Sequence, residues 1–196
     1  FIGGAHLVMD TTAGERERQS LEPLLVTPAS RSAIVSGKIA AACVIGLLTL
    51  LLTLLAFKVS ASLAGGSIGQ MLKLGIGAMA QMLLVMLPML FIGTTLLTLL
   101  SASAKSLKEA QSHMTWLMLL PMLPGYALMV YPIKSALWQF AVPFLAQNQM
   151  LIKLIRQEPI SAQTWAVYLG AGLALSLLLW AATVYRYNQE RLAISG

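Results

Sequence analysis

Long stretches without any charged side chain are the feature that most constrains the fold of this chain. Asp, Glu, Lys and Arg are absent from residues 39–57, 74–104, 111–133 and 159–185. A helix that crosses a bilayer needs about 20 predominantly apolar residues, and each stretch supplies about that many or more. Only 10% of the residues are charged and 58% are hydrophobic, whereas soluble domains carry about 25% charged residues. The sequence therefore predicts an all-α, polytopic membrane helix bundle and excludes a soluble or disordered chain.

We expect four full spans, with the tail of a preceding span at residues 1–10. The spans are predicted at 38–57, 74–103, 112–133 and 164–185. The chain opens at Phe1 inside an apolar run. We therefore expect it to be the C-terminal part of a longer protein.

The third span and the segment after it depart from regular helix. Pro121, Pro124 and Gly125 predict a kinked or locally unwound helix in the third span. Residues 134–163 contain two apolar halves that are each too short to cross a bilayer. A re-entrant or interfacial pair of short helices on the outer side fits this segment better than a fifth crossing.

Basic residues divide unevenly between the two sides that four spans create. One side, with residues 10–38, 104–113 and 186–196, holds Arg16, Arg18, Arg31, Lys38, Lys105, Lys108, Arg186 and Arg191. The other side holds Lys58, Lys73, Lys134, Lys153 and Arg156. Because Lys and Arg are enriched in cytoplasmic loops, we expect the segment 11–37 and the tail 186–196 to be cytoplasmic.

The chain carries no catalytic or metal-binding pattern in its sequence. His6, His113 and Cys43 are widely separated, which gives no zinc-ligand spacing. The motif GxxxxGK[ST] is absent, so the chain lacks the phosphate-binding loop of ATPases. We expect a transport subunit that is not an enzyme and that binds no cofactor or metal of its own.

Polar residues inside the predicted spans have two interpretations. Helix-to-helix hydrogen bonds, or bonds back to the preceding turn, are the simpler one. The other is a weakly polar translocation surface. Its candidate residues are Gln81, Thr94, Thr95, Thr98, Thr115 and Tyr126.

Residues 9–38 are dense in charge in a chain that otherwise has little. Ser20 can cap a short helix at 21–26, and Thr27-Pro28 ends that helix. The helix would present Leu21, Leu24 and Leu25 beside a polar group formed by Glu15, Arg16, Glu17, Arg18 and Glu22. The segment is either a solvated loop with weak ion pairs or a docking element for a cytoplasmic partner.

Three further stretches share with this segment a resemblance to a known family. The segment itself reads AGERERQSLEPLLVTPASRSAIVSGK, and the others are LLSASAKSLKEAQSHM, VPFLAQNQMLIKLIRQEPIS and the terminal YRYNQERL. In this order they resemble the type-2 ABC exporter permeases, and within them the sodium-efflux, Nat-type branch.

The resemblance implies a six-span permease half in a bacterial inner membrane. It would pair with a second half, as a homodimer, and with two copies of an ABC ATPase that binds the ATP and Mg²⁺. Residues 21–26 would be the coupling helix. The ATPase-docking residues would be Glu15, Arg16, Glu17, Arg18, Leu21, Glu22, Leu24 and Leu25.

The sequence does not decide whether the substrate is Na⁺ or a drug, peptide or lipid-like molecule. No carboxylate lies inside the predicted spans to coordinate a dehydrated Na⁺. A channel or scaffold subunit without an ATPase is the alternative function. A membrane-embedded enzyme that uses His6 or His113 is a further one.

Overall fold

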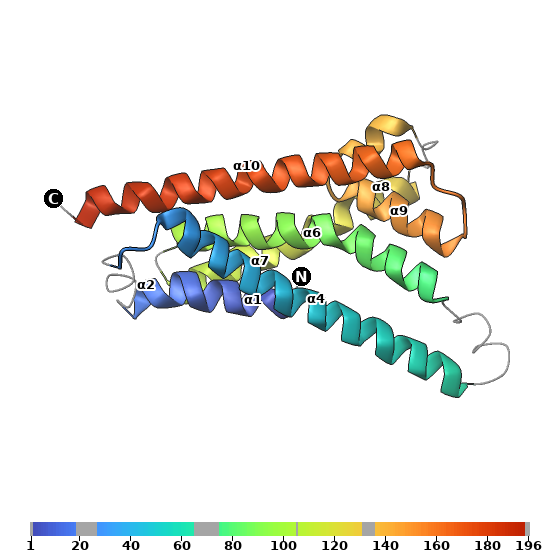
Figure 1. Cartoon of the computed structure of the whole chain (residues 1–196), viewed down its shortest axis with the longest axis horizontal. Helices are drawn as coiled ribbons and strands as arrows, with labels where there is room; N and C mark the ends of the chain where they lie inside the picture. The colour runs from blue at the N-terminus through green and yellow to red at the C-terminus, as the bar shows by residue number, and fades with distance from the viewer. Residues whose placement is uncertain (1, 19–26, 65–74, 105, 131–135, 195–196) are drawn as a thin grey trace.

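The computed structural model describes residues 2–18, 27–64, 75–104, 106–130 and 136–194, and within these ranges every regular element is helical. Residues 21–26, where the sequence predicts the coupling helix, lie outside the described ranges. The elements are α1 (Ile2–Met9), the π-helical turn η1 (Asp10–Gly14), α2 (Glu15–Glu17), α4 (Arg31–Ala64), α6 (Ile76–Ser103), α7 (Leu107–Leu119), α8 (Met122–Val130), the 3₁₀ turn η2 (Leu137–Ala141), α9 (Leu145–Ile155) and α10 (Ala162–Ile194) (Figure 1).

Within the described ranges, three helices are long and apolar enough to cross a membrane: α4, α6 and α10. The 34 residues of α4 extend for about 51 Å, which exceeds the ~30 Å hydrocarbon core of a bilayer. Half of the most apolar stretch of α6 is buried, against 22% for α4 and 17% for α10. The α6 helix is therefore the centre of the bundle, and it contacts α1, α4, α7, α9 and α10.

The sequence expects a fourth span at 112–133, and the structure has two shorter helices there. The α7 helix ends at Leu119 and α8 begins at Met122, on either side of Pro121. Proline has no N–H to donate, so the hydrogen-bond ladder is interrupted at this point. The Asn148 side-chain amide of α9 donates to the Pro121 carbonyl at 3.1 Å. A side chain of α9 thus bonds to a backbone carbonyl at the break.

The helix α1 does not stop at residue 10, where the sequence places the end of the preceding span. It continues through η1 and α2 to Glu17, and Thr12, Ala13 and Gly14 are buried in the bundle. The first residues of the predicted cytoplasmic segment 11–37 are therefore part of the packed structure.

Small residues set the closest helix crossings. A Cβ atom on Gly4 would lie 2.3 Å from the carbonyl oxygen of Ala42, so α1 and α4 touch backbone to backbone. A Cβ on Gly172 would lie 2.5 Å from the Cβ of Pro88, where α10 crosses α6. Close approach at small residues is how helices pack inside membranes, where no hydrophobic effect drives them together.

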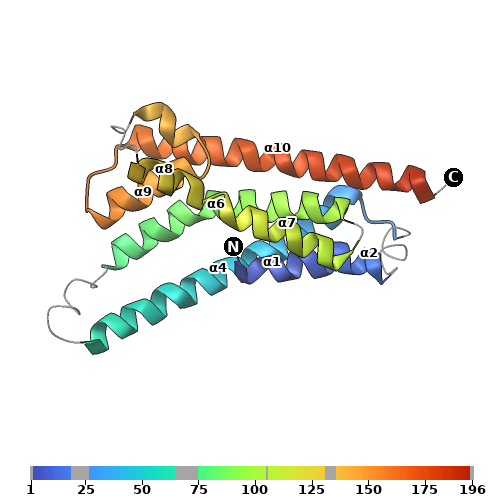
Figure 2. The ribbon, with the colours of Figure 1, turned by 180° about the vertical axis from the view of Figure 1, so that it is seen from behind.

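Among the three long helices, α4 runs antiparallel to α6 and α10, so the two ends of the bundle carry different chain segments (Figure 1). The α2 helix, the start of α4, the end of α6, the start of α7 and the end of α10 lie at one end (Figures 1 and 2). The opposite end carries the end of α4, the start of α6, and the η2–α9 segment beside the start of α10 (Figure 1). The chain segments that the sequence assigns to one side of the membrane therefore lie together in space.

The crossing at Gly172 can be tested with a matched pair of variants. Gly172→Ala should lower the melting temperature of the protein in detergent by about 3–8 °C, because the new methyl group overlaps the Pro88 ring. Gly170→Ala lies on the same helix, and a Cβ added there would have nothing within 4 Å, so it isolates the gain in helix propensity. Equal melting temperatures for the two variants would contradict the close approach.

Candidate functional site

Charged side chains from η1, α2, the residue after α2 and α4 lie at the end of the bundle where α2 ends and α4 begins. We call Asp10, Glu15, Glu17, Arg18 and Lys38 the charged end cluster. These residues come from the segment that the sequence predicts to dock a partner, and from the helix that follows it. The contacts that these side chains make within the protein determine which of them a partner could reach.

Lys38 is the residue that links the most elements of this cluster. Its ammonium group forms an ion pair with the Glu15 carboxylate of α2 and donates a hydrogen bond to the Thr11 carbonyl of η1. It also lies 5.9 Å from the centre of the Tyr187 ring on α10, within the range of a cation–π contact. The Lys38 side chain is 9% exposed and that of Glu15 is 25% exposed. This pair is largely shielded from solvent, so removal of either partner would leave a shielded charge without its counter-ion.

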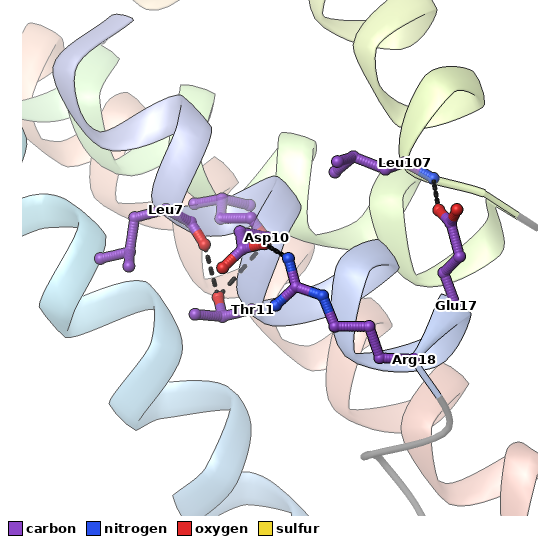
Figure 3. A network of polar contacts seen from close by, with 7 residues as sticks. Leu7, Asp10, Thr11, Glu17, Arg18 and Leu107 are labelled. Atoms are coloured by element: carbon purple, nitrogen blue, oxygen red, sulfur yellow. Dashed lines mark hydrogen bonds and ion pairs between the residues drawn. The ribbon is translucent and has the colours of Figure 1, made fainter.

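Glu17 links the N-terminal segment to α7. Its carboxylate accepts a hydrogen bond of 2.8 Å from the backbone N–H of Leu107, the first residue of α7 (Figure 3). Ser106 caps the same helix by accepting from the Glu109 N–H at 3.3 Å. A carboxylate at a helix N-terminus satisfies a free N–H and interacts favourably with the helix dipole. Glu17 thus fixes the start of α7 against α2.

Arg18 remains on the surface. Its guanidinium pairs with Asp10 at 2.7 Å, and the two side chains are 65% and 50% exposed (Figure 3). An ion pair this open contributes little to stability. Arg18 and Glu17 are therefore both exposed to a partner, although each makes a contact within the protein, whereas Glu15 is half-buried.

The π-helical turn η1 comes directly before α2 and affects where the side chains of α2 point. The Thr11 hydroxyl donates to the Leu7 carbonyl at 2.7 Å, and a Cβ on Gly14 would lie 3.0 Å from the Asp10 carboxylate (Figure 3). A π-helical turn shifts the helix register, which rotates the residues after it relative to those before it. Glu15 and Glu17 follow this turn and lie two residues apart, about 200° around the helix, so they reach α4 and α7 on different sides of α2.

The predicted docking residues divide into three groups. Glu15 is half-buried and paired with Lys38, whereas Glu17 and Arg18 are exposed and bonded to Leu107 and Asp10. The Arg16 side chain and Leu21, Glu22, Leu24 and Leu25 lie outside the described part of the structure. The docking assignment for the apolar residues therefore stays a prediction.

The three threonines of the candidate translocation surface lie together on α6. Thr94, Thr95 and Thr98 are at most 3% exposed. Thr94 and Thr98 donate to the carbonyls of Leu90 and Thr94, each at 2.7 Å, and Thr95 donates to the Phe91 carbonyl. Thr94 also lies 3.2 Å from the Cys43 sulfur, which joins α6 to α4. The hydroxyl groups of these threonines therefore donate hydrogen bonds to carbonyls of their own helix, α6.

The other candidates for that surface are elsewhere. Gln81, Thr115 and Tyr126 are exposed on three different helices, and Thr115 donates to the Gln111 carbonyl at 3.2 Å. The structure does not bring the six residues into one surface. Within the described residues no group of three or more His, Cys, Asp or Glu side chains could hold a metal ion.

Two structural contacts were not foreseen from the sequence. Tyr168 donates from α10 to the Val85 carbonyl of α6, one turn before Pro88. The Gln147 amide of α9 lies 3.3 Å from the Met86 sulfur. Pro88 has no N–H for the Leu84 carbonyl, which marks this part of α6 as irregular, but nothing in the sequence indicates that Tyr168 bonds the neighbouring Val85 carbonyl.

The Lys38–Glu15 pair can be tested by a double-mutant cycle. Lys38→Met should lower the melting temperature in detergent by about 6–10 °C, because it removes the cation from a shielded carboxylate. The combination with Glu15→Gln should recover part of that loss. Lys58→Met, at the other end of α4, is the control and should change the temperature little. Strict additivity of the two substitutions would show that the pair is not coupled.

Comparison with known proteins gives two matches. The family model described as "ABC-2 family transporter protein" matches residues 4–192 of the chain. The chain is 31% identical over 160 residues to the ABC transporter permease protein NatB of Bacillus subtilis (strain 168), which covers 78% of this chain and 41% of that protein. The chain thus spans about two-fifths of the length of this relative. No solved structure matches it significantly. The chain belongs to the ABC-2 family of transporter permeases, and it is a NatB-like, multi-pass membrane protein.

Proposed function

We propose that this chain is part of an ABC exporter permease that couples ATP hydrolysis by a separate subunit to substrate movement. The observation that carries the proposal is the Lys38–Glu15 contact. It joins the two helices, α2 and α4, between which residues 19–26 are connected. A displacement of this segment by a partner would therefore act on both helices together.

The coupling helix is assigned to residues 21–26, with Leu21, Leu24 and Leu25 as its apolar contacts. Arg18 provides an exposed charge directly before it. Glu17 would pass a movement of α2 to α7, because its carboxylate holds the first N–H of that helix. Two ATPase copies, with their ATP and Mg²⁺, and a second permease half complete the proposed assembly, most simply as a homodimer.

The charged end of the bundle is assigned to the cytoplasm of a bacterial inner membrane. Arg18, Arg31, Lys38, Lys108 and Arg186 all belong to segments at this end. The excess of basic residues supports the assignment, because Lys and Arg are enriched in cytoplasmic loops. The end of α10 would then be cytoplasmic and the η2–α9 segment external.

Two substrate classes fit the sequence and the family. Na⁺ efflux follows from the resemblance to the Nat-type branch. A drug-like or lipid-like substrate is supported by a largely apolar cavity of about 470 Å³ at the proposed outer end, lined by residues of α8, η2 and α9. No Asp or Glu lies inside the apolar stretches of α4, α6 or α10, which disfavours a dehydrated Na⁺ site among the described residues.

The docking assignment predicts loss of ATPase capture in one variant and not in another. Leu24→Asp should reduce capture of the ATPase by the full-length permease at least tenfold, because it places a charge in an apolar contact. Ile155→Asp makes the same change at a 67% exposed residue of α9 and should leave capture unchanged. If neither the wild type nor the variants capture an ATPase, the channel or scaffold alternative is favoured.

The proposed orientation predicts which cysteines react from outside the cell. In a Cys43→Ser background, Gln163→Cys at the start of α10 should react with an impermeant maleimide on intact cells. Lys108→Cys at the start of α7 should react only after the membrane is opened. Both side chains replaced are exposed. The reverse labelling pattern would invert the topology.

A further inference from the structure

A small cavity lies where η2 and α9 pack against α6 and α10. Its volume is about 20 Å³, and a single water molecule needs about 10–15 Å³ of such space. The apolar part of its wall includes Pro88, Phe140 and Gly172, and the polar side chains in the wall are Gln147 and Tyr168. The cavity therefore has room for a water molecule or a small ion and not for an organic ligand.

Gln147 of α9 brings to this cavity an acceptor that the protein does not use. The side chain is 8% exposed, and its Nε2 atom donates to the Met86 sulfur of α6 at 3.3 Å. A thioether sulfur has no hydrogen to donate, so the nitrogen faces Met86 and the Oε1 atom faces elsewhere. Among the residues that the structure describes, none donates to this oxygen. A buried amide oxygen without a donor is costly, which indicates a donor that is not part of the protein.

Tyr168 of α10 offers a second acceptor. Its side chain is 5% exposed, and its hydroxyl donates to the carbonyl of Val85, the residue before Met86 on α6. This bond uses the only hydrogen of the hydroxyl, so the Tyr168 oxygen can only accept a further bond. The Gln147 and Tyr168 oxygens cannot bond to each other, because neither has a hydrogen available.

The chemistry of these two oxygens selects the ligand. Water has two hydrogens to donate, and buried waters bond to polar groups that are otherwise unpaired. Hard cations such as Mg²⁺ and Ca²⁺ take about six or more oxygen ligands, usually with carboxylates among them, and no Asp or Glu lines this cavity. Two neutral oxygens in a mostly apolar wall therefore suit water better than a cation.

We propose that the cavity is the binding site of one ordered water, which donates to Gln147 Oε1 and Tyr168 Oη. The water joins α9 to α10 at the turn of α6 that precedes Pro88, where the proline already interrupts the helix. A bond through water is nearly as favourable as a direct one and can be exchanged when α6 bends. The site does not depend on the ATPase or on the substrate that is transported.

X-ray radiolysis of the full-length permease with its partner subunits tests for this water. X-rays split bound water into hydroxyl radicals, which oxidise the side chains beside it, and mass spectrometry of the peptides locates the oxidised residues. Phe140 lines the cavity and is only 4% exposed, so its oxidation would report the bound water. Met150 lies in the same core cluster, is 0% exposed and does not line the cavity, so it should stay unoxidised. An unoxidised Phe140 would overturn the proposal.

Gln147→Leu removes the acceptor and keeps a side chain of similar size. In this variant the oxidation of Phe140 should fall to the level of Met150, and Tyr168→Phe should lower it in part. Gln163→Leu makes the same change at an exposed residue of α10 and should give the wild-type result. Oxidation of Met150 would show that a variant has opened the core, and the remaining variant then decides.

Two further outcomes would contradict the proposal. Oxidation of Phe140 that persists in Gln147→Leu and Tyr168→Phe, with Met150 unoxidised, would overturn the two bonds to water. The oxidation of Phe140 should also be the same in sodium chloride and in choline chloride. A change on removal of Na⁺ would assign the cavity to the cation.

Discussion

Satisfaction of the backbone inside the membrane is the constraint on which this bundle depends. Hydrocarbon offers no hydrogen bonds, so every N–H and C=O of a span must find its partner within the protein. Two prolines, Pro88 in α6 and Pro121 between α7 and α8, interrupt that internal pairing. Side chains from the chain that follows approach both points: the Tyr168 hydroxyl bonds the Val85 carbonyl and the Asn148 amide bonds that of Pro121. Helix α10 is thereby tied to α6 beside Pro88, and α9 is tied to the break at Pro121.

Much of the architecture follows from features that the sequence displays directly. The uncharged stretches predict α4, α6 and α10 because helix length and bilayer thickness are fixed quantities. Pro121 predicts an interruption because proline lacks an N–H, and the structure divides the helix there. The extension of α1 through η1 to Glu17 was not predicted, since a run of charged residues indicates solvent unless its partners are known.

The contacts at the charged end depend on distance in space and not on spacing in sequence. Glu15 and Lys38 are separated by 23 residues, and Glu17 and Leu107 by 90. No helical periodicity relates such positions, so a carboxylate that docks a partner and one that caps a helix look alike in the sequence. The same limit applies to Thr94 and Thr98. A stripe of hydroxyls is compatible with a translocation surface, whereas the fold uses it for bonds within α6 and a contact with Cys43.

The two groups of contacts explain how a movement at one end could reach the other under the proposed mechanism. Glu17 holds the first residue of α7, and α7 leads to the break at Pro121, where Asn148 of α9 is attached. Lys38 holds α4 to α2, and Gly46 of α4 packs against Leu90 of α6. A displacement of α2 would therefore travel along α7 to the outer segment and along α4 to the central helix. Both routes end beside a proline, where the helix has fewer internal hydrogen bonds to break and bending costs least. The movement would begin at the charged end cluster, and the helices would bend near Pro88 and Pro121.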